Sequence, residues 1–349
     1  MKAEERLIQE IRRVVDSTPE LAGRLRCGIG DDAAILDRFN GNLVVTTDML
    51  CDGIDFICGK DQPEDIGRKT LAVNLSDLAA MGAVPLAVVI SVLLPLDAEK
   101  RIGPVSEFAE RFFRGMVPLA KQYAAAIAGG DTNAWHGAFA VSVTALGSVE
   151  PNRALLRGGA LPGDRIFVTG AVGGSIFGRQ FRFYPRIVEA LYLARYHRVH
   201  AAIDISDGLE IDLARLARES SVRYTLNRRA VPLHSDLLSP PADAETFPGW
   251  ETPKTPIEHA LGDGEDFELI LALPPEEARR LIAEQPFLAA ARGREKYRRR
   301  IESICQENGF LFSEEDYRQF AEAQLTEIGF FEEGIPADNP KDAGWEYQF

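Results

Sequence analysis

The segment Val73–Gly82, with the sequence VNLSDLAAMG, limits the possible folds of this chain more than any other segment. Apolar residues surround this helix-length stretch on nearly every side, and Gly82 is placed to end the helix. A helix that is apolar all round belongs inside a domain, yet Asp77 lies in the middle of this one. Because an unpaired buried carboxylate is too costly to keep ionised, Asp77 needs a partner, either backbone N–H groups or a bound cation.

Length and charge narrow the class of protein. A chain of 349 residues is long for a single core, so we expect two domains. The formal net charge of -14, with no dominant cluster of Lys and Arg, argues against a nucleic-acid partner. If the substrate is a polyphosphate, both partners are anionic and bound metal has to offset their repulsion.

The cysteines and the hydropathy pattern favour a cytoplasmic protein. Cys27, Cys51, Cys58 and Cys305 form no C-x-x-C pair, so we interpret them as reduced thiols and not as disulfides or a zinc site. The N-terminal residues show no apolar signal core, and no run of about 18 apolar residues occurs, so we expect no membrane association.

Turn signals divide the chain into two parts. The break at Glu150-Pro151-Asn152, followed by the turn Leu161–Asp164, predicts domains at 1–150 and 151–349. Residues 288–324 carry a mixed run of charges, which predicts a helical stretch that decorates the surface of the second domain. Neither the G-x-G-x-x-G spacing of dinucleotide loops nor a Walker A motif occurs, and no Ser-His-Asp or Cys-His arrangement is visible.

One short pattern recurs along the chain: a strand, then Gly or Thr, then Asp. Each instance alone has an ordinary explanation, such as a solvated turn or, for Ser206 and Asp207, the N-cap of the following helix. Carboxylates that converge from several strand ends are how proteins hold Mg²⁺ beside substrate phosphates. The series therefore predicts metal-assisted phosphate chemistry, and its members are Asp32, Asp48, Asp77, Asp131, Asp204 and Asp207.

Longer motifs make the series specific. They are GIGDDAA at 28–34, TTDML at 46–50, LAVNLSDLAAMG at 71–82, GGDT at 129–132, DISDGL at 204–209 and GEDFEL at 264–269. In this order they resemble the thiamine-monophosphate kinase family. The resemblance runs from about residue 6 to the C-terminus, except for 288–324.

The resemblance implies an activity and a fold. The activity is the ATP-dependent phosphorylation of thiamine monophosphate to thiamine diphosphate in the cytoplasm. The fold is like that of aminoimidazole ribonucleotide synthetase: two α/β (α+β) domains, the first a mixed sheet with helices that binds ATP and Mg²⁺ and pairs into a barrel across a homodimer, the second an α/β sandwich.

The resemblance also implies roles for individual residues. The positions that match Mg²⁺ ligands are Asp32, Thr46, Thr47, Asp48, Asp77, Asp131, Asp204 and Asp207, and we expect Asp77, Asp131 and Asp207 to be catalytic. Gly130, Asp131, Arg157 and Ser206 match nucleotide-binding positions. Glu265 and Trp345 match substrate positions, where an aromatic ring suits stacking on a thiamine ring. Asp55 stands where many relatives have His; it is the third candidate for a substrate contact, and it could instead bind metal.

The resemblance predicts a mechanism, and two alternative functions stay open. A phosphate oxygen of the substrate, already ionised at neutral pH, attacks the γ-phosphorus of ATP in line, with several Mg²⁺ ions and no strong general base. The rivals are another ATP-dependent enzyme of the same superfamily, such as selenophosphate synthetase, a purine-pathway synthetase or the hydrogenase-maturation dehydratase, and a non-catalytic nucleotide-binding protein. The dehydratase would need a C-terminal Cys, whereas this chain ends in Phe349.

Overall fold

The chain forms two compact units, each described here by itself. The computed structural model describes residues 13, 25–27, 33–36, 38–242, 244, 247, 250, 254–314 and 316–335. The first unit comprises Met1–Leu78, Ala83–Pro151 and Cys305–Leu311, and the second comprises Ala79–Gly82, Asn152–Ile304 and Phe312–Phe349. Two short segments, Ala79–Gly82 and Cys305–Leu311, thus depart from a simple division at residue 150.

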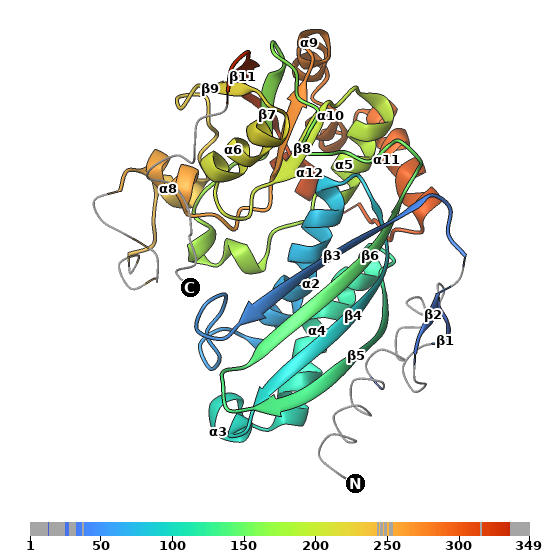
Figure 1. Ribbon diagram of the computed structural model, residues 1–349, viewed down its shortest axis with the longest axis vertical. Helices are drawn as coiled ribbons and strands as arrows, with labels where there is room; N and C mark the ends of the chain where they lie inside the picture. The colour runs from blue at the N-terminus through green and yellow to red at the C-terminus, as the bar shows by residue number, and fades with distance from the viewer. Residues whose placement is uncertain are drawn as a thin grey trace. The chain divides into compact units, whose positions relative to one another are not determined.

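The first unit is built on a mixed four-stranded sheet (Figure 1). Its strands are β3 (Asn42–Cys51), β4 (Val84–Pro95), β5 (Ala126–Trp135) and β6 (Ala140–Val149), in the order β3-β6-β4-β5. Only β4 and β5 pair in parallel. The helices are α2 (Pro63–Ala80), α3 (Ala98–Ile102) and α4 (Val105–Gln122), and β1 (Leu25–Cys27) pairs with β2 (Ile35–Leu36).

Helix α2 confirms the prediction made for the segment around Asp77. Leu71, Leu75 and Leu78 are fully buried, as an all-round apolar helix requires. The helix ends at Ala80, and Gly82 follows with φ +63° while its N–H donates to Ala79 O at 2.8 Å.

Helices α2 and α4 pack closely on one face of the sheet (Figure 1). A Cβ at Gly67 would lie 1.9 Å from Phe112 O, and a Cβ at Gly115 would lie 1.8 Å from Glu64 O. Only glycine therefore fits at these two points where one helix backbone meets the other.

The opposite face of the same sheet carries exposed apolar side chains. Alternation along β3 turns Leu43, Val45 and Met49 to this face, where they are 50%, 57% and 61% exposed. No helix within the described residues covers it. An antiparallel or mixed sheet with an apolar outer face is typical of a surface that becomes buried in an assembly.

The second unit is built on a five-stranded antiparallel sheet in the order β8-β10-β7-β11-β9. The strands are β7 (Arg165–Thr169), β8 (Ala201–Asp204), β9 (Arg223–Leu226), β10 (Leu269–Leu273) and β11 (Leu325–Glu332). The helices are α5 (Ile187–Tyr196), α6 (Leu209–Glu219), α7 (Ser235–Leu238), α8 (Pro256–Gly262), α9 (Pro275–Glu284), α10 (Pro286–Ala291), α11 (Glu295–Asn308) and α12 (Gln319–Glu322), with short turns η2 (Ser175–Phe177), η3 (Arg179–Phe181) and η5 (Asp316–Arg318).

Apolar residues of α6 hold the strands of this sheet from one side. Leu209, Leu213 and Leu216 are fully buried in one cluster with Val168 of β7 and Ile270 of β10. Helix α6 confirms the prediction of a helix after Asp207, and its leucines at 209, 213 and 216 have the spacing of one helix face.

Strand lengths differ from the prediction at two site residues. Asp48 and Asp131 lie inside β3 and β5, and not at strand ends. We expected a glycine turn at Gly129–Gly130, but a Cβ at Gly130 would lie 1.9 Å from Ile90 O. Glycine is therefore present because β5 runs very close to β4, and the strand continues through it.

Residues 288–324 are helical as predicted, but describing them as surface decoration was wrong. Ile301 and Phe320 are fully buried, and Ile304 is nearly so. On helix α11, Arg299 is exposed and Arg298 and Arg300 are half-buried, while the apolar positions of the helix contribute to the core.

Candidate active site

The helix-covered face of the first sheet brings together Asp77 of α2 and the Thr46–Asp48 segment of strand β3. Asp77 is the one residue of 71–80 that is not buried, and Thr46 Oγ1 donates a hydrogen bond to Asp77 Oδ2 at 2.5 Å. Asp48 N–H donates to Asn74 Oδ1 at 3.2 Å, which ties the edge strand to the helix one turn before Asp77. Alternation along β3 directs Thr46 and Asp48 to the same side, so hydroxyl and carboxylate oxygens gather there.

Thr47 and Asp131 lie on the other face of that sheet. Thr47 Oγ1 donates to Val143 O at 3.1 Å and accepts from Thr144 Oγ1 at 3.1 Å. The strand register places Asp131 in one row with Ser91, Ser142 and Met49, at the far edge from β3. Three strand spacings, about 14 Å, separate the two edges. A single copy of the sheet therefore does not bring Asp131 to Asp48.

Metal ligation was tested on the geometry of the described side chains. Among them, no group of three or more His, Cys, Asp and Glu is arranged to hold a metal ion. Two predicted site residues, Asp32 and Trp345, lie outside the described residues. The acids that are described offer the hard oxygen donors that Mg²⁺ prefers, so the type of ligand fits although no such group is formed.

In the second unit, the segment between β8 and α6 carries three of the predicted residues. Asp204 ends β8 and is 3% exposed, while Ser206 and Asp207 are half-buried. The prediction that Ser206 or Asp207 caps α6 was wrong, because Gly208 occupies the N-cap position.

Asp212, in the first turn of α6, instead binds the two residues that precede the N-cap. Its Oδ2 accepts from the N–H groups of Ser206 and Asp207, each at 2.9 Å, and its Oδ1 accepts from Arg215 at 2.8 Å. Burial raises the pKa of Asp212 to about 6. The Asp212 carboxylate therefore fastens the 206–207 segment to α6 and does not cap a helical N–H group.

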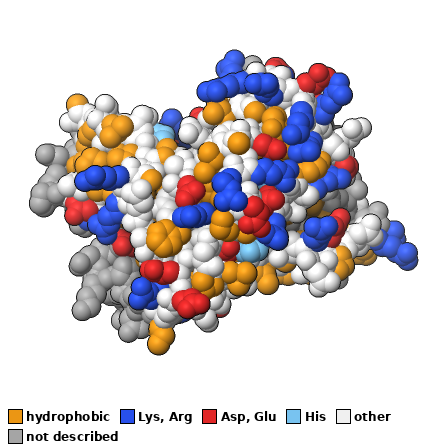
Figure 2. Space-filling view, turned by 90° about the horizontal axis from the view of Figure 1, so that it is seen from above, with side chains coloured by type: hydrophobic (Ala, Val, Ile, Leu, Met, Phe, Trp, Pro, Cys, Tyr) orange, Lys and Arg blue, Asp and Glu red, His pale blue; other side chains and the backbone are white. Residues whose placement is uncertain are grey.

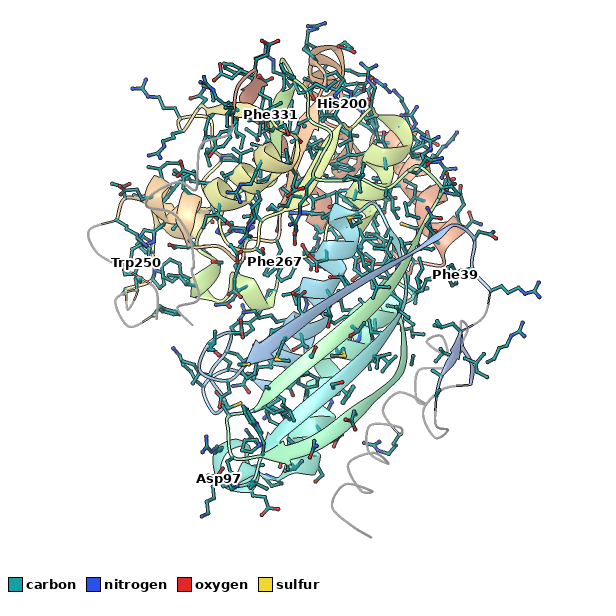
Figure 3. All side chains as sticks on the ribbon, viewed as in Figure 1. Phe39, Asp97, His200, Trp250, Phe267 and Phe331 are labelled. Atoms are coloured by element: carbon teal, nitrogen blue, oxygen red, sulfur yellow. The ribbon has the colours of Figure 1, made fainter. Side chains whose placement is uncertain are left out.

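The turn 264–269, in which Figure 3 labels Phe267, is hydrogen-bonded to this segment. Glu265 N–H donates to Ser206 O at 2.7 Å, and Phe267 N–H donates to Ile205 O at 2.8 Å. A Cβ at Gly264 would lie 2.6 Å from Ser206 O, so a glycine is required at this approach. The structure thus brings Glu265, Ser206 and Asp207 to one place in the fold.

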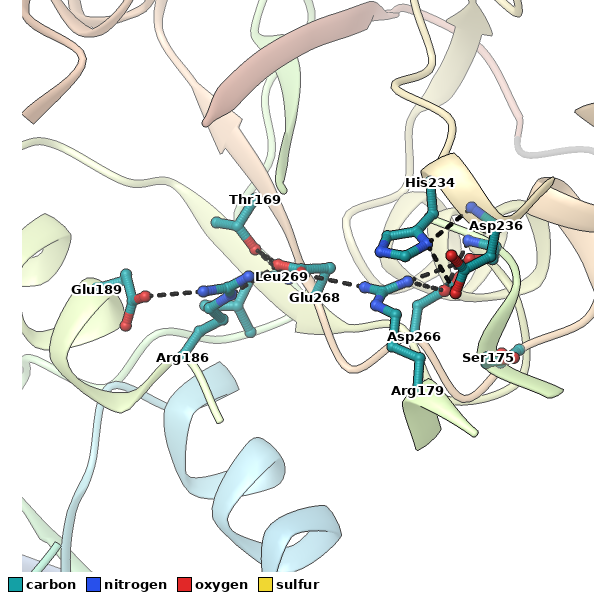
Figure 4. A network of polar contacts seen from close by, with 12 residues as sticks. Thr169, Ser175, Arg179, Arg186, Glu189, His234, Asp236, Asp266, Glu268 and Leu269 are labelled. Carbon is teal, nitrogen blue, oxygen red and sulfur yellow. Dashed lines mark hydrogen bonds and ion pairs between the residues drawn. The ribbon is translucent and has the colours of Figure 1, made fainter. Parts of the chain in front are cut away.

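A buried ionic cluster lies behind this turn, and the sequence analysis missed it. Figure 4 shows Glu268 bonded by Arg186 through two nitrogens, at 2.8 and 2.6 Å, and by Thr169 at 2.7 Å. Arg179 donates to Asp266 Oδ1 at 3.0 Å and to Glu268 Oε1 at 3.3 Å. No local sequence signal indicated the cluster, because the arginines that pair with these acids lie 82 to 89 positions away in the chain.

Two further predicted residues are held by their backbone or by neighbours. Asp55 Oδ2 accepts from Cys51 N–H at 2.7 Å, Asp55 O accepts from the buried Lys69 Nζ at 2.7 Å, and burial raises the pKa of Asp55. Arg157 is exposed, and its carbonyl accepts from Ser220 Oγ at 2.8 Å. Their roles toward substrate and nucleotide stay predictions.

Surface charge is mixed on the face drawn in Figure 2, where Lys and Arg side chains are interspersed with Asp and Glu. None of the described helices is long and apolar enough to cross a membrane.

Comparison with known proteins identifies the family. Residues 30–149 match the family described as AIR synthase related protein, N-terminal domain. The chain is 40% identical over 260 residues to the thiamine-monophosphate kinase of Rhodopirellula baltica, which covers 72% of this chain and 77% of the relative. It is 34% identical over 274 residues to that of Bacillus subtilis, covering 72% and 78%.

The chain belongs to the thiamine-monophosphate kinase family. The predicted family and the predicted enzyme class, a thiamine-phosphate kinase, are confirmed.

Solved structures agree with the predicted fold. The thiamine-monophosphate kinase of Stenotrophomonas maltophilia K279a matches with a TM-score of 0.68 at 28% identity and covers 97% of each chain. A structure described as "AaThiL complexed with AMPPCP and TMP" matches with a TM-score of 0.65 at 27% identity and covers 91% of each. Hydrogenase maturation protein HypE in complex with ATP, at 20% identity and a TM-score of 0.66, shows likeness of fold alone. The aminoimidazole ribonucleotide synthetase-like fold is thereby confirmed.

Proposed function

We propose that this thiamine-phosphate kinase transfers the γ-phosphoryl group of ATP directly to the phosphate of thiamine monophosphate, in line, to form thiamine diphosphate. The observation that carries the proposal is the 40% identity to a curated thiamine-monophosphate kinase over most of both chains. The structural relative described with AMPPCP and TMP supports a nucleotide and the phosphorylated substrate as the two ligands.

Several Mg²⁺ ions complete the proposal. The oxygens that would hold them belong to Thr46, Asp48 and Asp77 in the first unit and to Asp204 and Asp207 in the second, with Asp32, Thr47 and Asp131 as the remaining predicted ligands. Bound Mg²⁺ would reduce the repulsion between two anionic substrates on a chain whose own net charge is -14. The phosphate that attacks is already ionised, so the residues around it need to orient it and exclude water, and no strong base is required.

The same proposal includes the residues that touch the organic substrates. Gly130, Asp131, Arg157 and Ser206 would contact the nucleotide, and Arg157 would neutralise phosphate charge. Glu265 would contact thiamine monophosphate, with Trp345 and Asp55 as further contacts. Glu265 is supported by its place beside Ser206 and Asp207 in the fold.

A cytoplasmic homodimer is the expected form of the enzyme. The apolar outer face of the first sheet, with Leu43, Val45 and Met49 exposed, supports pairing of two such sheets in a barrel. Pairing would give Thr47 and Asp131, which lie on that face, a second set of neighbours.

The test is incubation of the purified chain with ATP, Mg²⁺ and thiamine monophosphate, with thiamine diphosphate measured by chromatography. Formation of thiamine diphosphate that depends on all three reagents is the expected result. Nucleotide binding without thiamine diphosphate would instead indicate a non-catalytic nucleotide-binding protein or a superfamily enzyme with another substrate. Sedimentation of the same sample would check the homodimer.

A further inference from the structure

The turn 264–269 has an unusual backbone on both sides of Asp266. Glu265 has φ +55° and Phe267 has φ +52°, values in the left-handed region that side chains other than glycine rarely adopt. Such residues persist only where the surrounding structure fixes them, and they concentrate at functional sites. Asp266, which lies between them, is therefore placed to hold both.

The Asp266 side chain is anchored from the opposite direction to the Glu265 backbone. It is 1% exposed, and its Oδ1 accepts from Gly173 N–H at 2.7 Å and from Arg179 Nη1 at 3.0 Å (Figure 4). Arg179 also donates to Gly173 O at 3.2 Å, so the two donors to Oδ1 are bonded to each other's segment. The turn is thus fixed between Ser206 on one side and the 173–179 segment on the other.

The other carboxyl oxygen of Asp266 behaves differently. Oδ2 is buried and has no hydrogen-bond partner among the described residues. Burial raises the pKa of Asp266 to about 7, against the opposing effect of Arg179. A neutral group of the same shape therefore suits this site, provided that it keeps the oxygen that Gly173 and Arg179 bind.

We propose that Asp266 is a positioning residue: its Oδ1, bound by Gly173 and Arg179, fixes the left-handed turn that directs Glu265 toward thiamine monophosphate. The inference rests on the proposed function, in which Glu265 is a substrate contact. Asp266 acts through Glu265 and through no contact of its own with the substrate.

The different surroundings of the two carboxyl oxygens make the proposal testable with one conservative variant and one truncating variant. In Asp266→Asn, Oδ1 keeps both of its donors and Nδ2 takes the place of the oxygen that has no partner. In Asp266→Ala, both bonds to Oδ1 are lost. A positioning role through Oδ1 predicts that Asn restores function, whereas a role through the charge or through Oδ2 predicts that Asn fails as Ala does.

The experiment is steady-state kinetics with ATP, Mg²⁺ and thiamine monophosphate on the wild type, Asp266→Ala, Asp266→Asn, Glu265→Ala and the double variant Glu265→Ala/Asp266→Ala. We expect Asp266→Ala to raise KM for thiamine monophosphate about tenfold and to leave KM for ATP unchanged. We expect Asp266→Asn to stay within about twofold of the wild type. In the Glu265→Ala background, Asp266→Ala should add nothing, because the group through which it acts is already absent.

Three outcomes would overturn the proposal. They are an active wild type whose KM is unchanged in Asp266→Ala, an Asp266→Asn variant as impaired as Asp266→Ala, and an Asp266→Ala effect of equal size with and without the Glu265 side chain. A wild type that forms no thiamine diphosphate is a different result, because it rejects the proposed function itself. If Asp266→Ala fails to fold by circular dichroism, Arg179→Gln removes one of the two donors, and an unchanged KM for thiamine monophosphate in it overturns the proposal equally.

Discussion

The acids of α2 and β3 and the acids of the turn 264–269 are held in opposite ways. Asp77 keeps partial exposure and accepts from the neutral hydroxyl of Thr46. Glu268 is 3% exposed and is bound by two nitrogens of Arg186, which is itself 3% exposed. Charge at Glu268 is neutralised inside the protein by Arg186, and Asp77 differs from it in keeping partial exposure. Partial exposure leaves the Asp77 carboxylate accessible to a cation from solution, whereas the buried Glu268 is suited to holding the fold.

The largest expected effect tests the first half of this comparison. Asp77→Asn should lower turnover about 10³-fold, which corresponds to about 4 kcal/mol, because the carboxylate charge that would bind Mg²⁺ is lost. The fold should persist, since an amide can still accept from Thr46. Kinetics and a thermal unfolding midpoint check both statements.

Asp65→Asn is the matched control, because Asp65 is an acid in the first turn of the same helix and has no predicted role at the site. Its turnover should equal that of the wild type. Near-normal turnover in Asp77→Asn would remove Asp77 from the site. It would also reject the statement that Asp77 is suited to binding a cation from solution.

The second test addresses the buried cluster. Glu268→Ala should destabilise the fold by about 3 kcal/mol, because it leaves Arg186 buried without its bidentate partner. Urea unfolding followed by circular dichroism measures the change. Glu276→Ala, which removes an exposed ion pair with Arg198, serves as the control and should leave stability unchanged. Equal stability of the two variants would show that burial of the cluster contributes nothing.

The third test measures how the free energy of unfolding changes with pH. The expected direction of the change follows from the raised pKa of Asp266. Its pKa is raised from 3.8 to about 7 in the folded state by burial, in surroundings that include Arg179, Glu268 and Asp263. The folded chain thus binds a proton that the unfolded chain has already lost, and the associated stability is complete below pH of about 4 and is lost as pH rises through about 7.

We therefore expect the wild type to lose stability relative to Asp266→Asn between pH 5 and pH 8, by about 2 kcal/mol. Unfolding curves of both proteins at each pH measure the difference, and the shared titrations of other groups cancel. The raised pKa of Asp266 is contradicted if the difference in free energy of unfolding between the two proteins stays constant with pH, or if the wild type gains stability relative to Asp266→Asn as pH rises.

The same contrast explains what could be predicted from the sequence. The helix around Asp77 and the helix after Asp207 could be predicted from the sequence, and the structure confirms them. Strand ends at Asp48 and Asp131 were mistaken, because whether a glycine marks a turn or a close strand approach depends on a neighbouring strand that is distant in sequence.

The partners of the buried acids could not be predicted from the sequence either. The pairing of Arg186 with Glu268 joins residues 82 positions apart in the chain, and no local pattern encodes it. The acids predicted to bind metal were easier to nominate because each lies in one of the short motifs of the sequence. Which of them meet around one ligand depends on tertiary placement, and the two faces of the first sheet show that proximity along a strand does not decide it.

The smallest expected effect concerns Asp212 at the start of α6. This acid shares features with both Asp77 and Glu268. Asp212 is buried and bonded by Arg215, as in the cluster, yet it serves the N–H groups of Ser206 and Asp207, which belong to the candidate site. Asp212→Ala should lower stability by about 1 kcal/mol, because the N–H groups of Ser206 and Asp207 lose their acceptor. Glu210→Ala on the same helix, which removes a more exposed ion pair with Arg228, should have no measurable effect on unfolding. Asp212→Ala could instead raise KM for ATP while its stability matches that of Glu210→Ala. In that case the Asp212 side chain acts on the proposed nucleotide site more than on the stability of the fold. Asp212 would then be grouped with Asp77 and not with Glu268.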